Sequence, residues 1–96
     1  MKGYVVITKL RTRDLNELQQ YLDAAPKFNA GHEVKFLARF GRCEVVEGGH
    51  AEGVAILEFP SMDAARAWYR SPLYQDATLH RLRSGDYNFL ICEGVD

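Results

Sequence analysis

Apolar residues recur with a period of two in four stretches of the chain, as is typical of β-strands. The first and third stretches are apolar on both faces, and a strand of that kind is covered on both faces. The second stretch bends at Gly41 and is expected to continue over residues 43–47, before a turn at Gly48-Gly49-His50. The predicted strands are residues 4–10, 33–40, 52–59 and 86–93.

A helix is predicted between the first two strands. Asp14 and Glu17 have the spacing of a capping box, in which each residue satisfies a backbone N–H of the other. Pro26 is expected to kink or end this helix, and Asn29-Ala30-Gly31 is a plausible C-terminal stop. Four residues follow at helical spacing and predict the buried stripe: Leu15, Leu18, Leu22 and Ala25.

A second helical segment follows the third strand and is predicted to be interrupted. Pro60 stops the strand, and Ser61 is a good helix N-cap. Ala65 and Trp68 are expected to face the core. Ser71-Pro72 should restart the helix, because serine caps well and proline suits the first helical position. Gly85 is expected to end the restarted helix.

The predicted order is β-α-β-β-α-β, with no linker or repeat, so residues 1–96 form one domain. This order is typical of an α+β, ferredoxin-like fold, in which one four-stranded antiparallel sheet carries helices on one face. The apolar residues on the other face need a second cover. A second copy of the same sheet is the economical one, so we expect a sheet-to-sheet homodimer that forms an α/β barrel.

Composition and charge exclude several classes of partner. The 96 residues carry a net charge of −1 and no basic run, so no nucleic-acid binding is expected. No apolar span is long enough to cross a membrane, and the N-terminus lacks the pattern of a signal peptide. Cys43 and Cys92 lie outside any metal-ligand or redox motif. We therefore expect reduced thiols, small apolar roles for both cysteines, and a cytoplasmic location.

Arg39 and Glu58 are the first candidate site residues, with a ligand-binding role. If the turn centres on residues 48–51, Arg39 lies diagonal to Glu58 on the neighbouring strand. Such a pair could bind a carboxylate or polarise a carbonyl in a small barrel. The alternative is an ion pair that satisfies only itself between the strands.

Aromatic and histidine residues supply the remaining candidates. Tyr69 and Tyr74 flank the helix restart, where each could aim a hydroxyl into a cleft as a ligand-binding or catalytic group, although such residues usually belong to the core. His50 is the acid–base candidate, because mobile loops at a barrel mouth often carry function. An exposed histidine without a role is the alternative.

The histidines give no metal-ligand spacing. His32, His50 and His80 form no H-x-H, H-x-x-x-H or H-E-x-x-H pattern, so neither a metal nor another cofactor is predicted. A single haem-ligating histidine would leave no spacing signal.

Several short segments together form a pattern typical of one family. The most specific block is Glu58-Phe59-Pro60-Ser61 followed by residues 67–72 and Tyr74-Gln75, and weaker matches lie at residues 1–4, 35–39, 47–48 and 93–94. With these segments the chain resembles domain-of-unknown-function family 1330, a branch of the dimeric α/β barrels. The family tends to carry glycine pairs before the lysine and after the arginine. Here those places contain His32-Glu33-Val34 and Phe40-Gly41-Arg42.

The resemblance implies a fold and a homodimer but no particular reaction. The wider superfamily includes cofactor-free monooxygenases, lactone isomerases, haem proteins and simple binding modules, so fold alone does not decide function. Two hypotheses follow: a small-molecule site between sheet and helices of a cofactor-independent enzyme, or a homodimer that binds a metabolite or partner without chemistry. An enzyme requires two of the candidate polar groups to converge on one void.

Overall fold

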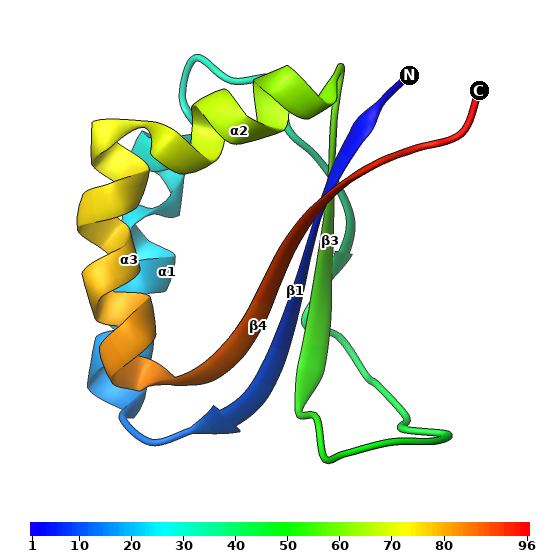
Figure 1. Ribbon diagram of the computed structural model, residues 1–96. Helices are drawn as coiled ribbons and strands as arrows, with labels where there is room; N and C mark the ends of the chain where they lie inside the picture. The colour runs from blue at the N-terminus through cyan, green and yellow to red at the C-terminus, as the bar shows by residue number, and fades with distance from the viewer.

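Seven helices and strands follow one another in the computed structural model, which describes residues 1–96 (Figure 1). All neighbouring strands are antiparallel, in the order β2-β3-β1-β4. The α+β class and the ferredoxin-like order are therefore confirmed. The second helical segment consists of two consecutive helices. The elements are β1 (Gly3–Thr12), α1 (Leu15–Asn29), β2 (Lys35–Arg39), β3 (Gly53–Phe59), α2 (Met62–Arg70), α3 (Pro72–Ser84) and β4 (Gly85–Glu93).

The three helices lie on one side of the sheet, and the strands alternate between its two faces (Figure 1). On the helix side, Val5 and Ile7 of β1 and Ala55, Leu57 and Phe59 of β3 are buried. The opposite side carries no helix. We call it the outer sheet face, and its members are Tyr4, Val6, Thr8, Val54, Ile56, Glu58, Asn88, Leu90 and Cys92.

Helix ends follow the caps that the sequence predicts. Asp14 accepts hydrogen bonds from the backbone N–H groups of Asn16 and Glu17 at the start of α1. Ser61 accepts from the N–H of Ala64 at the start of α2. Each bond satisfies one of the N–H groups that the first turn of a helix leaves free. Local sequence therefore determines where α1 and α2 begin.

Ser71 joins α2 to α3, as predicted. Its hydroxyl donates to the carbonyl of Trp68 (2.8 Å) and accepts from the N–H of Tyr74 (3.4 Å). Its own N–H also donates to the Trp68 carbonyl (3.2 Å). One side chain thus closes the first helix and opens the second, while Pro72 takes the first helical position.

α1 ends at Asn29, where the stop at Asn29-Ala30-Gly31 is predicted, so the helix continues through Pro26 and does not end there. A proline inside a helix removes only one backbone hydrogen bond. The predicted buried stripe is wrong in part. The buried stripe consists of Tyr21, Ala25 and Phe28, whereas Leu15 is 74% exposed. The rings of Tyr21 and Phe28 each pack edge-on against the ring of Tyr74.

The β2–β3 connection is longer than predicted. Residues 43–47 form no strand, and the whole segment 40–52 is a connection that is exposed over most of its length. The register therefore places Arg39 opposite Ala55 and Lys35 opposite Glu58, with an irregularity between Phe36 and Ala38. This shift also changes which β2 side chains face the helices.

Replacing Ser71 with alanine should lower the free energy of unfolding by about 1 kcal/mol, because both helix ends lose a hydroxyl partner. Urea denaturation followed by circular dichroism measures this change. Ser71→Asn is the matched control, since asparagine also caps, and it should retain most of the stability. Equal urea midpoints for Ser71→Ala and the wild type would contradict the assigned role.

Candidate functional site

A cavity of about 380 Å³ lies between α1 and the helix side of the sheet. Its volume falls in the range of small-molecule sites. Twelve of its fifteen lining residues are hydrophobic. The lining residues are Ile7, Lys9, Leu18, Tyr21, Leu22, Ala25, Phe28, Asn29, Phe36, Arg39, Phe40, Ala55, Leu57, Trp68 and Tyr87.

The cavity exists because α1 packs mainly on α3 and makes few contacts with the sheet. Four rings hold the helices together, and we call them the aromatic cluster: Tyr21, Phe28, Trp68 and Tyr74. Their closest ring centroids are 4.2 Å apart for Trp68 and Tyr74 and 4.9 Å apart for Phe28 and Tyr74. The side chains of Ala25 and Ala55, in the helix and sheet walls, are too short to fill the space between them.

Two cations belong to the otherwise apolar lining. The guanidinium of Arg39 lies 4.3 Å from the ring centroid of Phe36, and the ammonium of Lys9 lies 5.3 Å from that of Phe40. Neither cation is in an ion pair with a carboxylate. The third polar lining residue, Asn29, accepts a hydrogen bond from the indole of Trp68 (2.8 Å). The lining therefore contains two cations and no anion.

The expected pair of Arg39 and Glu58 does not form. Arg39 is opposite Ala55 on the helix side of the sheet, whereas Glu58 belongs to the outer sheet face. Glu58 accepts a hydrogen bond from the hydroxyl of Tyr4 (3.0 Å) and pairs with the ammonium of Lys2 (3.4 Å). Arg39 itself is exposed. Of the two residues, only Arg39 lines the cavity.

Tyr74 and Tyr69 belong to the core and do not line the cavity. Tyr74 is fully buried, and its hydroxyl lies 3.0 Å from that of Tyr21. Burial raises the pKa of Tyr74 and raises that of Tyr21 still more strongly, so both phenols stay protonated at neutral pH. Tyr69 is half-buried and packs against Tyr74 and Phe89.

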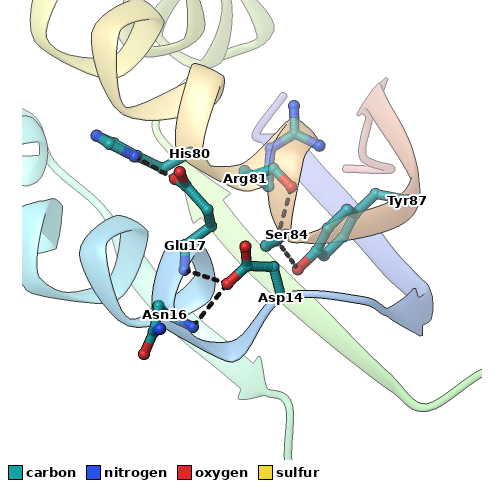
Figure 2. Close-up of polar contacts among 7 residues, drawn as sticks. All are labelled: Asp14, Asn16, Glu17, His80, Arg81, Ser84 and Tyr87. Atoms are coloured by element: carbon teal, nitrogen blue, oxygen red, sulfur yellow. Dashed lines mark hydrogen bonds and ion pairs between the residues drawn. The ribbon is translucent and has the colours of Figure 1, made fainter.

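The histidines do not converge on the cavity. His50 is exposed in the β2–β3 connection, beside Glu52, whose carboxylate accepts hydrogen bonds from Thr12. His80 on α3 contacts the carboxylate of Glu17 on α1 (2.5 Å), as Figure 2 shows. The reciprocal half of the predicted capping box is therefore not made, because Glu17 reaches to α3. No three His, Cys, Asp or Glu side chains are grouped as metal ligands.

Sequence reasoning missed several lining residues, Lys9 and Tyr21 among them. Lys9 shares a strand face with Val5 and Ile7, so an isolated charge on an apolar face was the available signal. Tyr21 lay outside the leucine stripe that the sequence favoured. Phe36 and Arg39 lie on the same face of the sheet only because the register is irregular between Phe36 and Ala38. No feature of the sequence predicts this irregularity.

Comparison with known families identifies the chain. Residues 2–95 match the profile of the family described as Domain of unknown function (DUF1330). The chain belongs to the DUF1330 family. No curated protein matches the sequence. No helix of this DUF1330 protein combines the length and the apolar character needed to cross a membrane.

Solved structures resemble this DUF1330 protein in fold at low sequence identity. A protein of unknown function from Rhodopseudomonas palustris has a TM-score of 0.70 at 16% identity, covering 99% of this chain and 83% of its own. A dimeric ferredoxin-like protein from Bacteroides fragilis has a TM-score of 0.67 at 13% identity, covering 97% and 96%. A candidate antibiotic biosynthesis monooxygenase from Caulobacter crescentus has a TM-score of 0.65 at 20% identity, covering 99% and 90%. These likenesses establish the fold.

The hydrogen bond between Tyr4 and Glu58 should make the stability of the folded protein depend on pH. The hydrogen bond from Tyr4 holds the pKa of Glu58 below its ordinary value of 4.5, so the folded protein binds this proton less tightly than the unfolded chain. The stabilisation is present at neutral pH and is lost as the pH falls below about 4.5. Tyr4→Phe should therefore narrow the difference in Tm between pH 7 and pH 4. An unchanged difference would contradict this role of Tyr4.

Proposed function

We propose that this protein binds a small, mainly apolar organic anion in the cavity between α1 and the sheet. The observation that carries the proposal is an apolar cavity whose only charged lining residues, Lys9 and Arg39, are both cations without a carboxylate partner. Apolar walls supply contact area, and a few polar groups orient the ligand.

Lys9 and Arg39 are the lining residues that would attract the anionic group of the ligand. The Phe36 ring beneath the Arg39 guanidinium leaves its N–H donors free, and a fixed guanidinium fork suits carboxylate geometry. Arg39 is exposed, so water screens its charge and its contribution to affinity is modest. Contact with the apolar walls therefore supplies most of the binding free energy.

The lining favours binding over acid–base catalysis. It contains no carboxylate, imidazole or thiol that could exchange a proton near neutral pH. Of the five candidate residues from the sequence, Arg39 lines the cavity, whereas Glu58, Tyr69, Tyr74 and His50 do not. The polar groups expected for a cofactor-independent enzyme thus do not converge on one void, which supports the non-catalytic alternative.

We also propose that the protein is a homodimer through its outer sheet face. Val6 pairs across the sheet with Ile56 on one side and Leu90 on the other, which forms an apolar centre that no helix covers. Leu90 is 54% exposed. The Bacteroides fragilis protein of the same fold is dimeric. A second copy of this face would bury the apolar centre and form an α/β barrel.

Filling the cavity should abolish ligand binding. We expect 2-naphthoate, an apolar anion, to bind the wild type in isothermal titration calorimetry. Ala55→Leu places additional side-chain volume in the cavity and should weaken this binding by at least about tenfold, because the ligand then competes with the leucine side chain. Ala67→Leu, at an exposed position of α2, is the matched control and should bind like the wild type. Equal binding by Ala55→Leu, or no binding by the wild type, would contradict the proposed site.

A charge in the centre of the outer sheet face should dissociate the dimer. Val6→Asp would bury an unpaired carboxylate in the interface, so sedimentation equilibrium should show a monomer where the wild type shows a dimer. Val46→Asp, at a position that is 85% exposed in the β2–β3 connection, is the control and should remain dimeric. A monomeric wild type at micromolar concentration would rule out the proposed assembly.

A further inference from the structure

Arg81 is a buried cation without a carboxylate partner. The residue is 4% exposed, and its Nε makes no hydrogen bond. No carboxylate lies within ion-pair distance of its guanidinium. Arginine is seldom buried to this degree unless it is paired. Arg81 is therefore a buried charge that no carboxylate of the chain compensates.

The surroundings of Arg81 offset this burial only in part. Its guanidinium lies 4.9 Å from the ring centroid of Phe89 and 5.2 Å from that of Tyr87. Such contacts with aromatic rings attract a cation, but they do not replace the hydrogen bonds that a guanidinium makes in water. The Nε–H of Arg81 is thus a buried donor for which the protein supplies no acceptor.

Three carboxylates of α1 and β4 have partners other than Arg81. Asp14 caps α1, Glu17 contacts His80, and Asp86 pairs with Arg13. In Figure 2 the guanidinium of Arg81 points away from the carboxylates of Asp14 and Glu17. An anion that compensates Arg81 must therefore come from outside the chain.

Arg81 lies next to the cavity wall. Tyr87, whose ring faces the guanidinium, is a lining residue, and so is Tyr21. The positive charge of Arg81 lowers the pKa of both Tyr21 and Tyr74, against the larger effect of burial, because the guanidinium is close to their hydroxyls. The buried cation is thus in contact with one residue of the cavity lining, Tyr87, and close to a second, Tyr21.

We propose that Arg81 is the buried anchor for the anionic group of the ligand. This inference rests on the proposed function of the cavity and identifies the ligand class as an aromatic carboxylate. The ring of Tyr87 lines the cavity and lies 5.2 Å from the guanidinium, so a ligand carboxylate in the cavity would approach Arg81 beside this ring. Phe28 and Trp68 in the lining suit an aromatic body. A buried guanidinium binds a carboxylate more strongly than exposed Arg39 does, because water screens it less.

The test compares 2-naphthoate with its neutral analogue 2-naphthamide by isothermal titration calorimetry. The wild type should prefer the carboxylate. Arg81→Met, which keeps the length of the side chain without its charge, should weaken naphthoate binding by about 10- to 100-fold and leave naphthamide binding nearly unchanged. Arg81→Lys keeps the charge but lacks the planar guanidinium that binds a carboxylate through two N–H groups. Its affinity for naphthoate should therefore lie between those of the wild type and Arg81→Met. Arg83→Met, exposed on the same helix, should bind like the wild type.

Ligand-free stability separates an anchor from a structural cation. Removing an uncompensated buried charge should leave the Tm of Arg81→Met unchanged or higher. If Arg81→Met fails to fold, or has a lower Tm and still prefers naphthoate, Arg81 is structural and the inference is overturned.

The binding results also separate this inference from the proposed function. Suppose that Arg81→Met and Arg81→Lys still prefer naphthoate over naphthamide as the wild type does, while Ala55→Leu binds neither compound. The cavity is then the ligand site, but Arg81 is not the residue that anchors the anionic group. If neither compound binds the wild type, the proposed function fails and the anchor fails with it.

Discussion

The packing of Trp68 on Tyr74 is the contact on which the arrangement of the helices depends. Ser71 turns the chain between these two residues, which places their ring centroids 4.2 Å apart. Phe28 of α1 then packs edge-on against both rings. α1 is thereby held against α3 and makes few contacts with the sheet. The cavity is a consequence of this aromatic packing, and the sheet supplies its opposite wall.

The distribution of charge gives this cavity its character. Lys9, Arg39 and Arg81 lie in or beside its wall without an ion-pair partner, whereas nearby carboxylates cap helices or pair with other cations. A buried cation lowers stability unless an anion compensates it. The same arrangement therefore limits the stability of the empty protein and favours a ligand with negative charge. Aromatic packing creates the space, and in the proposed function the unpaired cations select an anionic ligand.

Local signals made the strands, the helix starts and the break at Ser71 predictable, because capping depends only on residues a few positions apart. Features that depend on distant contacts were not predictable. Glu58 was predicted as the partner of Arg39 from a register that assumed a short turn between β2 and β3. The longer β2–β3 connection changes this register, so Arg39 and Glu58 lie on opposite faces of the sheet. Arg81 was missed because a charged helical residue is normally exposed. Its helical spacing from Tyr74 was the only signal in the sequence that placed it on the buried stripe of α3.

The occupant of the cavity can be located directly by nuclear magnetic resonance. Intermolecular nuclear Overhauser effects between the ring protons of 2-naphthoate and the methyl groups of the protein report which wall the ligand contacts. We predict contacts with the methyl groups of Ala25 and Ala55, which belong to the opposite walls of the cavity. Contacts confined to Val6, Ile56 and Leu90 on the outer sheet face would show that the ligand binds elsewhere and would contradict the central claim.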